Sequence, residues 1–387
     1  MTKVWSAWSG KGLEGVLQEC RELLEDMSFP TVHRWREGGG KVVGHFQVYF
    51  PEELAHAVGM LPVKLRGFPI ERKAADSHFG SYICSIVRSN LEVALTKRLP
   101  LDLFVSHPIC DVARNLPSVW RPNFQFPCLL LRLPQNPTAR LVLDFLEHEY
   151  RSLLSQMEEI TGKEVTDDDL RGSIEVFNEN RHLLRELYRI KREHPWLLSV
   201  EEAYVLMAVG TLLPRREHNE LLRYAIPLIY ERKARPQDKL RVVLLGGFCE
   251  QLPLELLRII GESCYVVDDD LLIGLRWITY DVPTQGDPVR NLAQAYLESD
   301  SFSPVQHDPR RPREEMILRF VRQSGAEAAI IGAAKMCEPG LDEQVAYAKA
   351  LDEAGIRYFV FDFEEAMTSF EQIQLQIETF VESIMFV

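Results

Sequence analysis

The chain has 387 residues, which at about 150 residues per domain corresponds to two or three domains. Its composition, 46% hydrophobic and 26% charged, is typical of folded proteins and excludes intrinsic disorder and collagen-like repeats. The formal net charge of -13 argues against a nucleic-acid-binding protein, because neutralising phosphates requires a basic face. A small molecule or another protein is the expected partner.

The first elements indicate a cytoplasmic protein. The N-terminal residues lack the apolar segment of a signal peptide, and the longest uncharged run, 203–213, is shorter than the roughly 20 residues that span a membrane. We therefore expect no membrane anchor. Apolar residues recur at three- and four-residue intervals from Leu13 to Met27, which predicts an N-terminal helix that buries Cys20.

Two stretches of the chain alternate short apolar runs with helical patterns. The first contains KVVGHFQVYF, LDLFVSH and CLLLRLP, and the second contains RVVLLGGF, CYVVDDD, AAIIGAA and YFVFDFE. Runs that are apolar throughout are typical of parallel strands covered on both faces. Between them the pattern is helical and includes a capping box at Thr166 and Asp169.

These patterns predict an α/β fold, with two Rossmann/flavodoxin-like parallel-sheet domains and a helical section between them. The expected division is an N-terminal helix at 1–30, a first α/β domain at 31–140 with Cys84 and Cys110, the helical section at 141–237, and a second α/β domain at 238–387 with Cys337.

The seven cysteines can be sorted by their place relative to the predicted strands. Parallel sheets carry functional groups at the carboxyl ends of their strands, where the next helix begins. Cys110, Cys249 and Cys337 follow strands and lie on this edge, and Cys84 precedes the strand that leads to Cys110, its expected partner. The other three begin strands or lie on a buried helical stripe, and we expect them to be structural: Cys20, Cys128 and Cys264.

Thiolates at helix N-termini have lowered pKa values and bind soft metals, so cysteines converging from separate loops suit zinc or an iron–sulfur cluster. Spacing alone does not decide this, because the gaps between these cysteines are far longer than in zinc fingers or bacterial ferredoxins. An inert core thiol is the alternative at each position.

The amino-acid sequence around the cysteines resembles that of a known family. SYICSIVRSNLEVAL, PLDLFVSHPICDVARNLPSVW, PQNP and KMCEPGLDEQVAYAKALDEAGIRYFVFDFEE are similar to the benzoyl-CoA reductase and 2-hydroxyacyl-CoA dehydratase family. SIEVFNENRHLLRELY and TYDVPTQGDP resemble more narrowly its small cluster-binding (gamma/C-type) subunits of ATP-dependent class I benzoyl-CoA reductase. The resemblance extends from about residue 48 to the C-terminus.

This resemblance implies a [4Fe-4S] cluster held by Cys84, Cys110 and Cys337, with one iron open to a ligand other than cysteine. It implies an oxidoreductase subunit that reduces benzoyl-CoA, an acyl-CoA substrate, to a cyclohexadiene-carbonyl-CoA. The implied partners are a homologous cluster-binding subunit, ATPase activator subunits and ferredoxin as the electron source. The chain has neither a Walker motif nor a strand-linked G-x-G-x-x-G, which fits ATP hydrolysis on a separate subunit.

Three alternatives remain open at this point. Two share the fold: a 2-hydroxyacyl-CoA dehydratase subunit and a double-cubane cluster reductase. The third is a cluster-free scaffold that positions coenzyme A for a sister chain. Cys249 is either a packed thiol or a ligand near the cluster, and the stretch DDDLLIGLRW lacks the further cysteines that a larger double-cubane needs.

Several other polar residues are candidates for chemistry. The catalytic residue is unknown. His107 is a weak candidate for a proton donor because it lies three residues before Cys110. His56 and His218 are candidates only because histidine can donate a proton near neutral pH. The residues 268–270 are consecutive aspartates at a strand end, where helix capping and hard-cation binding are the two interpretations.

Overall fold

The computed structural model describes residues 8, 10–46, 49–246, 251–271, 279, 281–298, 308, 310–364 and 367–386. Two four-stranded sheets organise the chain, and every strand pair in them is parallel. The first sheet contains β1 (Lys41–Phe46), β2 (Met60–Leu65), β3 (Leu103–Ser106) and β4 (Cys128–Leu130). The second contains β5 (Leu240–Leu245), β6 (Cys264–Asp269), β7 (Ala328–Ala334) and β8 (Arg357–Phe363).

Both sheets have the same strand order. The first runs β2-β1-β3-β4 and the second β6-β5-β7-β8, so each chain path reverses direction between its first and third strands. Such a reversal leaves a crevice at the carboxyl ends of the two central strands, which is where ligands bind in open α/β sheets. The two crevices to consider are therefore those of β1 with β3 and of β5 with β7.

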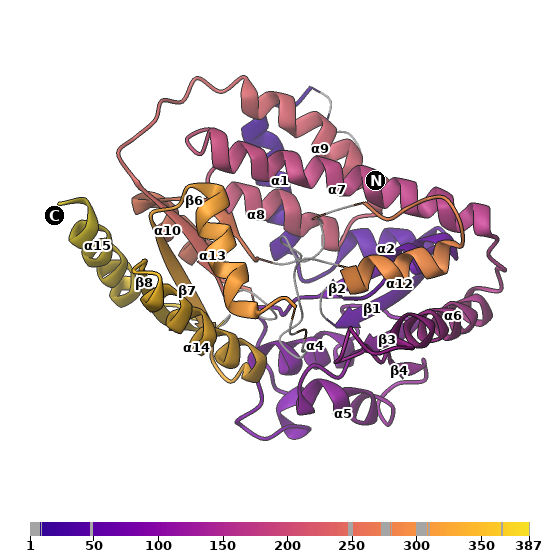
Figure 1. Cartoon of the computed structure of the whole chain (residues 1–387). Helices are drawn as coiled ribbons and strands as arrows, with labels where there is room; N and C mark the ends of the chain where they lie inside the picture. Colours follow the sequence, from indigo (N-terminus) through magenta and orange to yellow (C-terminus); the bar gives the residue numbers. More distant parts are fainter. Residues whose placement is uncertain are drawn as a thin grey trace.

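Helices fill the connections and form the section between the sheets (Figure 1). In the first half they are α1 (Leu13–Glu25), α2 (Pro30–Glu37), α3 (Glu52–Ala57), the 3-10 turn η1 (Ala75–Ser77), α4 (Ser85–Leu95) and α5 (Asp111–Trp120). The middle section has α6 (Val142–Thr161), α7 (Asp167–Glu193), α8 (Val200–Ala208), η2 (Val209–Thr211) and α9 (Arg215–Tyr230). The second half has α10 (Leu254–Ser263), α12 (Pro288–Glu298), α13 (Arg313–Ser324), α14 (Glu338–Glu353) and α15 (Glu371–Met385).

One hydrophobic core is shared by both sheets. Side chains alternate between the faces of a strand, and Val42 of β1 and Val242 of β5 belong to the same buried cluster, together with residues of α1, α8 and α10. The opposite faces have separate cores: Val43 packs under α6 and α12, and Val243 packs under α13 and α14. The shared core fixes the two sheets relative to each other.

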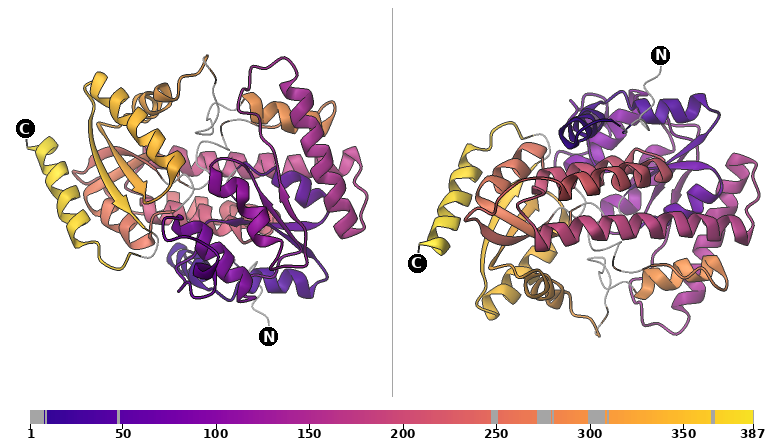
Figure 2. Two further views of the ribbon diagram at one scale, coloured as in Figure 1. Left: turned by 90° about the horizontal axis from the view of Figure 1, so that it is seen from below. Right: turned by 90° about the horizontal axis from the view of Figure 1, so that it is seen from above.

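The long helix α7 connects the halves. Its 27 residues correspond to a length of about 40 Å. It packs against α3 of the first half and against β6 of the second, and the view from above shows it crossing between them (Figure 2). Its N-terminus carries the expected capping box, in which Thr166 and Asp169 exchange hydrogen bonds, so that prediction is confirmed.

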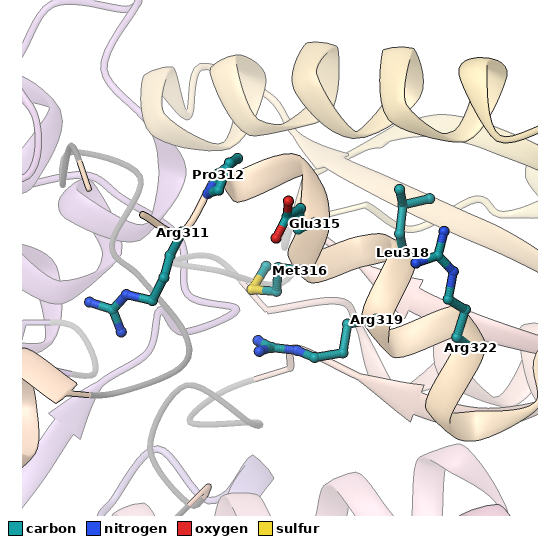
Figure 3. A pocket seen from close by; sticks show the side chains of 7 residues that line it. All are labelled: Arg311, Pro312, Glu315, Met316, Leu318, Arg319 and Arg322. Atoms are coloured by element: carbon teal, nitrogen blue, oxygen red, sulfur yellow. The ribbon is translucent and has the colours of Figure 1, made fainter. Parts of the chain in front are cut away.

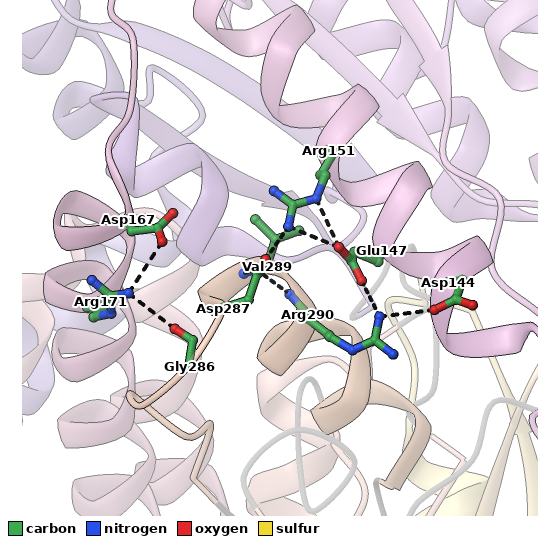
Figure 4. A network of polar contacts seen from close by, with 9 residues as sticks. All are labelled: Asp144, Glu147, Arg151, Asp167, Arg171, Gly286, Asp287, Val289 and Arg290. Carbon is green, nitrogen blue, oxygen red and sulfur yellow. Dashed lines mark hydrogen bonds and ion pairs between the residues drawn. The ribbon is translucent and has the colours of Figure 1, made fainter.

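Helix α12 lies next to α6 and α7 although it belongs to the second half of the sequence. Arg290 contacts Asp144 and Glu147 of α6, at 3.0 and 2.6 Å, and Arg151 joins Glu147 to Asp287 (Figure 4). These carboxylates and guanidinium groups are partly exposed, so the network contributes mainly orientation and little stability. The local sequence pattern did not indicate this crossing between halves.

The predicted fold class is confirmed: two parallel sheets of α/β type with helices between them. The N-terminal helix is also present, and its stripe, Cys20 included, is buried. The domain boundaries stay a prediction. Among the described residues, no helix combines the length and the apolar character that crossing a membrane requires.

Candidate functional site

The three cysteines named above share one local position: each is the N-cap residue of a helix. Cys84 precedes α4, Cys110 precedes α5 and Cys337 precedes α14. Cys110 and Cys337 follow the third strand of their respective sheets, and Cys84 lies in the segment after β2. All three thiols therefore lie on the carboxyl side of parallel strands, where helix N-termini present unpaired N–H groups and a positive dipole.

Two of these thiols are electrostatic neighbours although they come from different sheets. Burial raises the pKa of the Cys110 thiol, the N–H of Ala113 opposes this by donating to Sγ at 3.3 Å, and the nearby charge of Cys337 raises it further. Cys337 is buried, Cys84 and Cys110 are half-buried, and all three contact the shared core. The fold thus brings Cys110 and Cys337 together from opposite ends of the chain.

The turn before α14 has a shape that presents Cys337. Met336 adopts a left-handed conformation with φ 62°, which few non-glycine residues do, and its side chain is 59% exposed. A Cβ at Gly340 would lie 3.3 Å from the Cys337 Sγ. The glycine therefore leaves space beside the sulfur that any other residue would reduce.

The donor set at these helix N-termini consists of thiols. Within the described ranges, no three His, Cys, Asp or Glu side chains are close enough together to hold one ion. A cubane spreads its ligands over several irons, and thiolates are the ligands that iron–sulfur clusters take. Each of the three thiols lies at a helix N-terminus, where the helix dipole would favour the negative charge of a cluster, and Cys110 and Cys337 are neighbours.

The remaining described cysteines are buried core residues, as expected. Burial raises the pKa of Cys20 to about 12, of Cys128 to about 11 and of Cys264 to about 12. Such thiols stay protonated at neutral pH and are poor metal ligands. Cys249 lies outside the described residues.

His107 follows β3 and is completely buried. Neither ring nitrogen has a hydrogen-bond partner among the residues that the structure describes. Burial lowers the pKa of His107 to about 3, with the nearby His45 and Lys64 acting in the same direction. The ring is therefore neutral, so it can donate a proton only as an uncharged imidazole.

The other two candidate histidines have structural contacts. His56 lies 2.9 Å from the Ser173 hydroxyl, and burial lowers its pKa to about 4. His218 is buried between Asn180 and the carbonyl of Leu206, and burial lowers its pKa to about 3. Both rings hold helices together.

His45 of β1 and Lys64 of β2 lie near His107 and were not among the residues predicted from the sequence. The two are direct partners in the strand register, and both are buried. His45 Nε2 is 3.2 Å from a carboxylate oxygen of Glu52, and Arg215 pairs with the other oxygen. The Arg215 charge and the His45 hydrogen bond outweigh burial and lower the pKa of Glu52 to about 2. The available signal was a polar residue inside each apolar strand, KVVGHF and MLPVKL.

The aspartates at the end of β6 contact α7. Asp268 pairs with Arg192 at 2.6 Å, and Asp269 accepts a hydrogen bond from Tyr188 at 2.7 Å and pairs with Lys191. Burial raises the pKa of Asp268 to about 6, against the opposing Arg192 and Lys191. The structure therefore uses Asp268 and Asp269 to join β6 to α7. Residues 272–278 lie outside the described part of the chain, so the capping interpretation stays a prediction.

A cavity of about 480 Å³ lies beside α13 (Figure 3). Three arginines line it, but their guanidinium groups do not converge on one point (Figure 3). Arg311 is already paired with Asp308 at 2.9 Å. This cavity is therefore a basic groove without the geometry of an anion clamp.

Comparison with known proteins gives the family. Residues 47–384 match the family described as 2-hydroxyglutaryl-CoA dehydratase, D-component (HGD-D). The chain belongs to this family. The match contains both sheets except β1, and all three N-cap cysteines. The predicted family is thereby confirmed.

Three relatives show how the similarity is distributed. A benzoyl-CoA reductase subunit of Thauera aromatica is 36% identical over 95% of this chain and 98% of the relative. Lactoyl-CoA dehydratase subunit beta of Anaerotignum propionicum is 26% identical over 96% and 99%. The (R)-2-hydroxyglutaryl-CoA dehydratase subunit beta of Acidaminococcus fermentans is 25% identical over 91% and 94%.

Proposed function

We propose that this chain is the iron–sulfur subunit of an ATP-dependent benzoyl-CoA reductase. The observation that carries the proposal is the distribution of similarity: the reductase subunit of Thauera aromatica is clearly more similar to this chain than the dehydratase subunits, over nearly the whole length of both proteins. The proximity of Cys110 and Cys337 supports the same conclusion, because a cluster held by cysteines from both halves of the chain needs those thiols close together.

The proposed reaction adds a pair of electrons and a pair of protons to the thioester-activated ring, which becomes a cyclohexadiene-carbonyl-CoA. A bound [4Fe-4S] cluster would supply electrons of low potential, and reduction of this ring requires the negative end of the cluster range, about −700 mV. Cys84, Cys110 and Cys337 would hold the cluster, and the N-termini of α4, α5 and α14 would stabilise its negative charge.

The proposal requires other proteins. We propose a homologous cluster-binding subunit as the partner, with ATPase activator subunits and ferredoxin delivering electrons in an anaerobic cytoplasm. The relatives are themselves named as subunits, which supports an assembly of several chains. The sequence contains neither a Walker motif nor a strand-linked G-x-G-x-x-G motif, so we assign ATP hydrolysis to the activator subunits.

A 2-hydroxyacyl-CoA dehydratase subunit is the second candidate. The family description and the two dehydratase relatives favour it. A double-cubane reductase needs additional thiols, and among the described residues the other three cysteines are buried in the core. Iron content separates these possibilities, since one cubane contains four irons and a double cubane eight.

The decisive experiment is anaerobic purification of the chain with its partner and activator subunits, followed by incubation with ATP, a reduced ferredoxin and benzoyl-CoA. We expect a cyclohexadiene-carbonyl-CoA product and about four irons per chain. Lactoyl-CoA or 2-hydroxyglutaryl-CoA serves as the matched alternative substrate. If either of these hydroxyacyl thioesters is dehydrated while benzoyl-CoA is not reduced, the chain is a dehydratase subunit and the reductase proposal is wrong.

A further inference from the structure

A second cavity, of about 280 Å³, lies where the two sheets and the N-terminal helix meet. Its lining contains one cation, Arg66, and a largely apolar wall of Tyr204, Leu252, Leu254, Met367 and Phe370. Arg66 directly follows β2, the leucines follow β5, and Met367 and Phe370 follow β8. The cavity therefore lies on the carboxyl side of strands from both sheets, the side that binds ligands in this type of fold.

Arg66 is a buried cation that pairs with no carboxylate among the residues that the structure describes. Its side chain belongs to a residue only 7% exposed, and Nη2 donates to the carbonyl of Leu24 at 2.9 Å. The buried Nε has no hydrogen-bond partner, and no Asp or Glu of the described chain forms an ion pair with the guanidinium. Phe68 lies under it, 5.4 Å from the guanidinium carbon to the ring centroid.

A charge in this position points to a ligand. Removing a guanidinium from water without a countercharge is unfavourable, and proteins normally pair buried charges. Here Arg66 lines a largely apolar cavity, and its guanidinium has N–H groups beyond the one that donates to Leu24. An oxygen acceptor on a bound molecule supplies the missing partner.

The walls define the rest of that molecule. Tyr204 and Phe370 offer aromatic faces, and Met367 is a thioether that packs well against rings. The volume suits a group of about the size of one substituted ring and is below the usual range for a drug-sized ligand. Two exposed carboxylates, Glu25 and Glu255, line the rim, so the lining as a whole disfavours a multiply charged phosphate group.

We propose that this cavity binds an aromatic ring carrying one carboxyl or acyl oxygen, with Arg66 donating to that oxygen. Two sources share this chemistry: a free aromatic carboxylate, and the aromatic acyl end of a thioester. The thioester source rests on the proposed function, whereas affinity for the free acid does not. In the first case the cavity is a separate effector site, and in the second it is the acyl pocket.

The test measures binding of benzoate, benzoyl-CoA and free coenzyme A to the full chain by isothermal titration under anaerobic conditions. We expect saturable binding of benzoate, of benzoyl-CoA, or of both, and none of free coenzyme A in competition with them. Arg66→Met is expected to weaken the binding about 10- to 100-fold, because one hydrogen bond to a charged group is lost. Arg223→Met, at an exposed ion pair of α9, is the matched control and should leave affinity unchanged.

A second variant keeps the test independent of the cation. Leu254→Trp fills the cavity from the start of α10 and should abolish binding with Arg66 intact. If benzoate binds and both variants weaken that binding, the ligand of the cavity is the free acid. If only benzoyl-CoA binds, the ligand is the thioester. If neither compound binds, or if both variants bind as the wild-type chain does, the proposal is wrong. A complex that binds benzoate but fails to reduce benzoyl-CoA would instead refute only the proposed function.

Discussion

The cysteines show how position decides the chemistry of one residue type. Cys20, Cys128 and Cys264 are enclosed by apolar side chains, which raise their pKa values and keep them protonated. Burial also raises the pKa of Cys110, but a backbone N–H at the start of α5 donates a hydrogen bond to its sulfur. Cys110 therefore differs from Cys20, Cys128 and Cys264 in having a helix N–H that donates to its sulfur, and not in the direction of its pKa shift.

His107 predicts a measurable pH dependence of stability. Its pKa is about 3 in the folded chain and about 6.5 when unfolded, so between these values only the unfolded state binds the proton. The contribution of His107 to the free energy of unfolding is fully present above pH 6.5. It falls by about 1.4 kcal/mol per pH unit as the pH drops toward 3. We expect His107→Gln to remove this contribution from the free energy of unfolding measured in denaturant at pH 7, 6 and 5.

The control for that series is His78→Gln, at an exposed histidine, which should leave the pH dependence of the wild-type chain nearly unchanged. Equal slopes for His107→Gln and the wild-type chain would contradict a neutral, buried ring.

At the scale of elements, α7 is the helix that ties the second sheet to the first. Its C-terminal part carries Lys191 and Arg192, which pair with Asp269 and Asp268 at the end of β6. Lys191 and Asp269 are both almost fully buried. A buried pair contributes little net stability, but removing one partner leaves an uncompensated charge in the interior.

Asp269→Asn tests this joint. The substitution leaves Lys191 buried without its countercharge and should lower the free energy of unfolding by about 3–5 kcal/mol. Lys191→Met added to it removes the stranded charge and should restore most of that loss. Denaturant unfolding of the two variants and the wild-type chain measures both effects; a double variant no more stable than Asp269→Asn would show that the pair has another role.

Local sequence patterns predicted these elements well where the pattern is self-contained. AAIIGAA is β7 from Ala328 to Ala334, and the capping box at Thr166 begins α7. The patterns could not show that α12 packs on α6, nor that Arg66 is enclosed by segments from both sheets. Those relations depend on contacts between residues far apart in the chain. A single polar residue in an apolar run does not show which residue it will contact.

The same limit applies to the candidate site. Strand-edge reasoning placed Cys110 and Cys337 on one functional edge, and the structure makes them electrostatic neighbours. The role of all three cysteines as cluster ligands stays a prediction. His45 and Lys64 were missed because their burial beside His107 follows from the register of β1 and β2, which sequence alone does not give.

At the scale of the whole molecule, two sheets of identical strand order share one core. That core, which includes Val42 of β1 and Val242 of β5, fixes their relative position, so loops from both halves can contribute to one site. A cluster held in this way would link the halves covalently through metal–thiolate bonds and add its binding energy to the stability of the fold. The central claim is that Cys84, Cys110 and Cys337 act as one ligand set.

Iron and acid-labile sulfide content of anaerobically purified cysteine variants tests that claim most directly. We expect about four irons per wild-type chain, a loss of most of that iron in each of Cys84→Ala, Cys110→Ala and Cys337→Ala, and wild-type content in the core control Cys128→Ala. Wild-type iron in all three ligand variants, or an equal loss in Cys128→Ala, would contradict it.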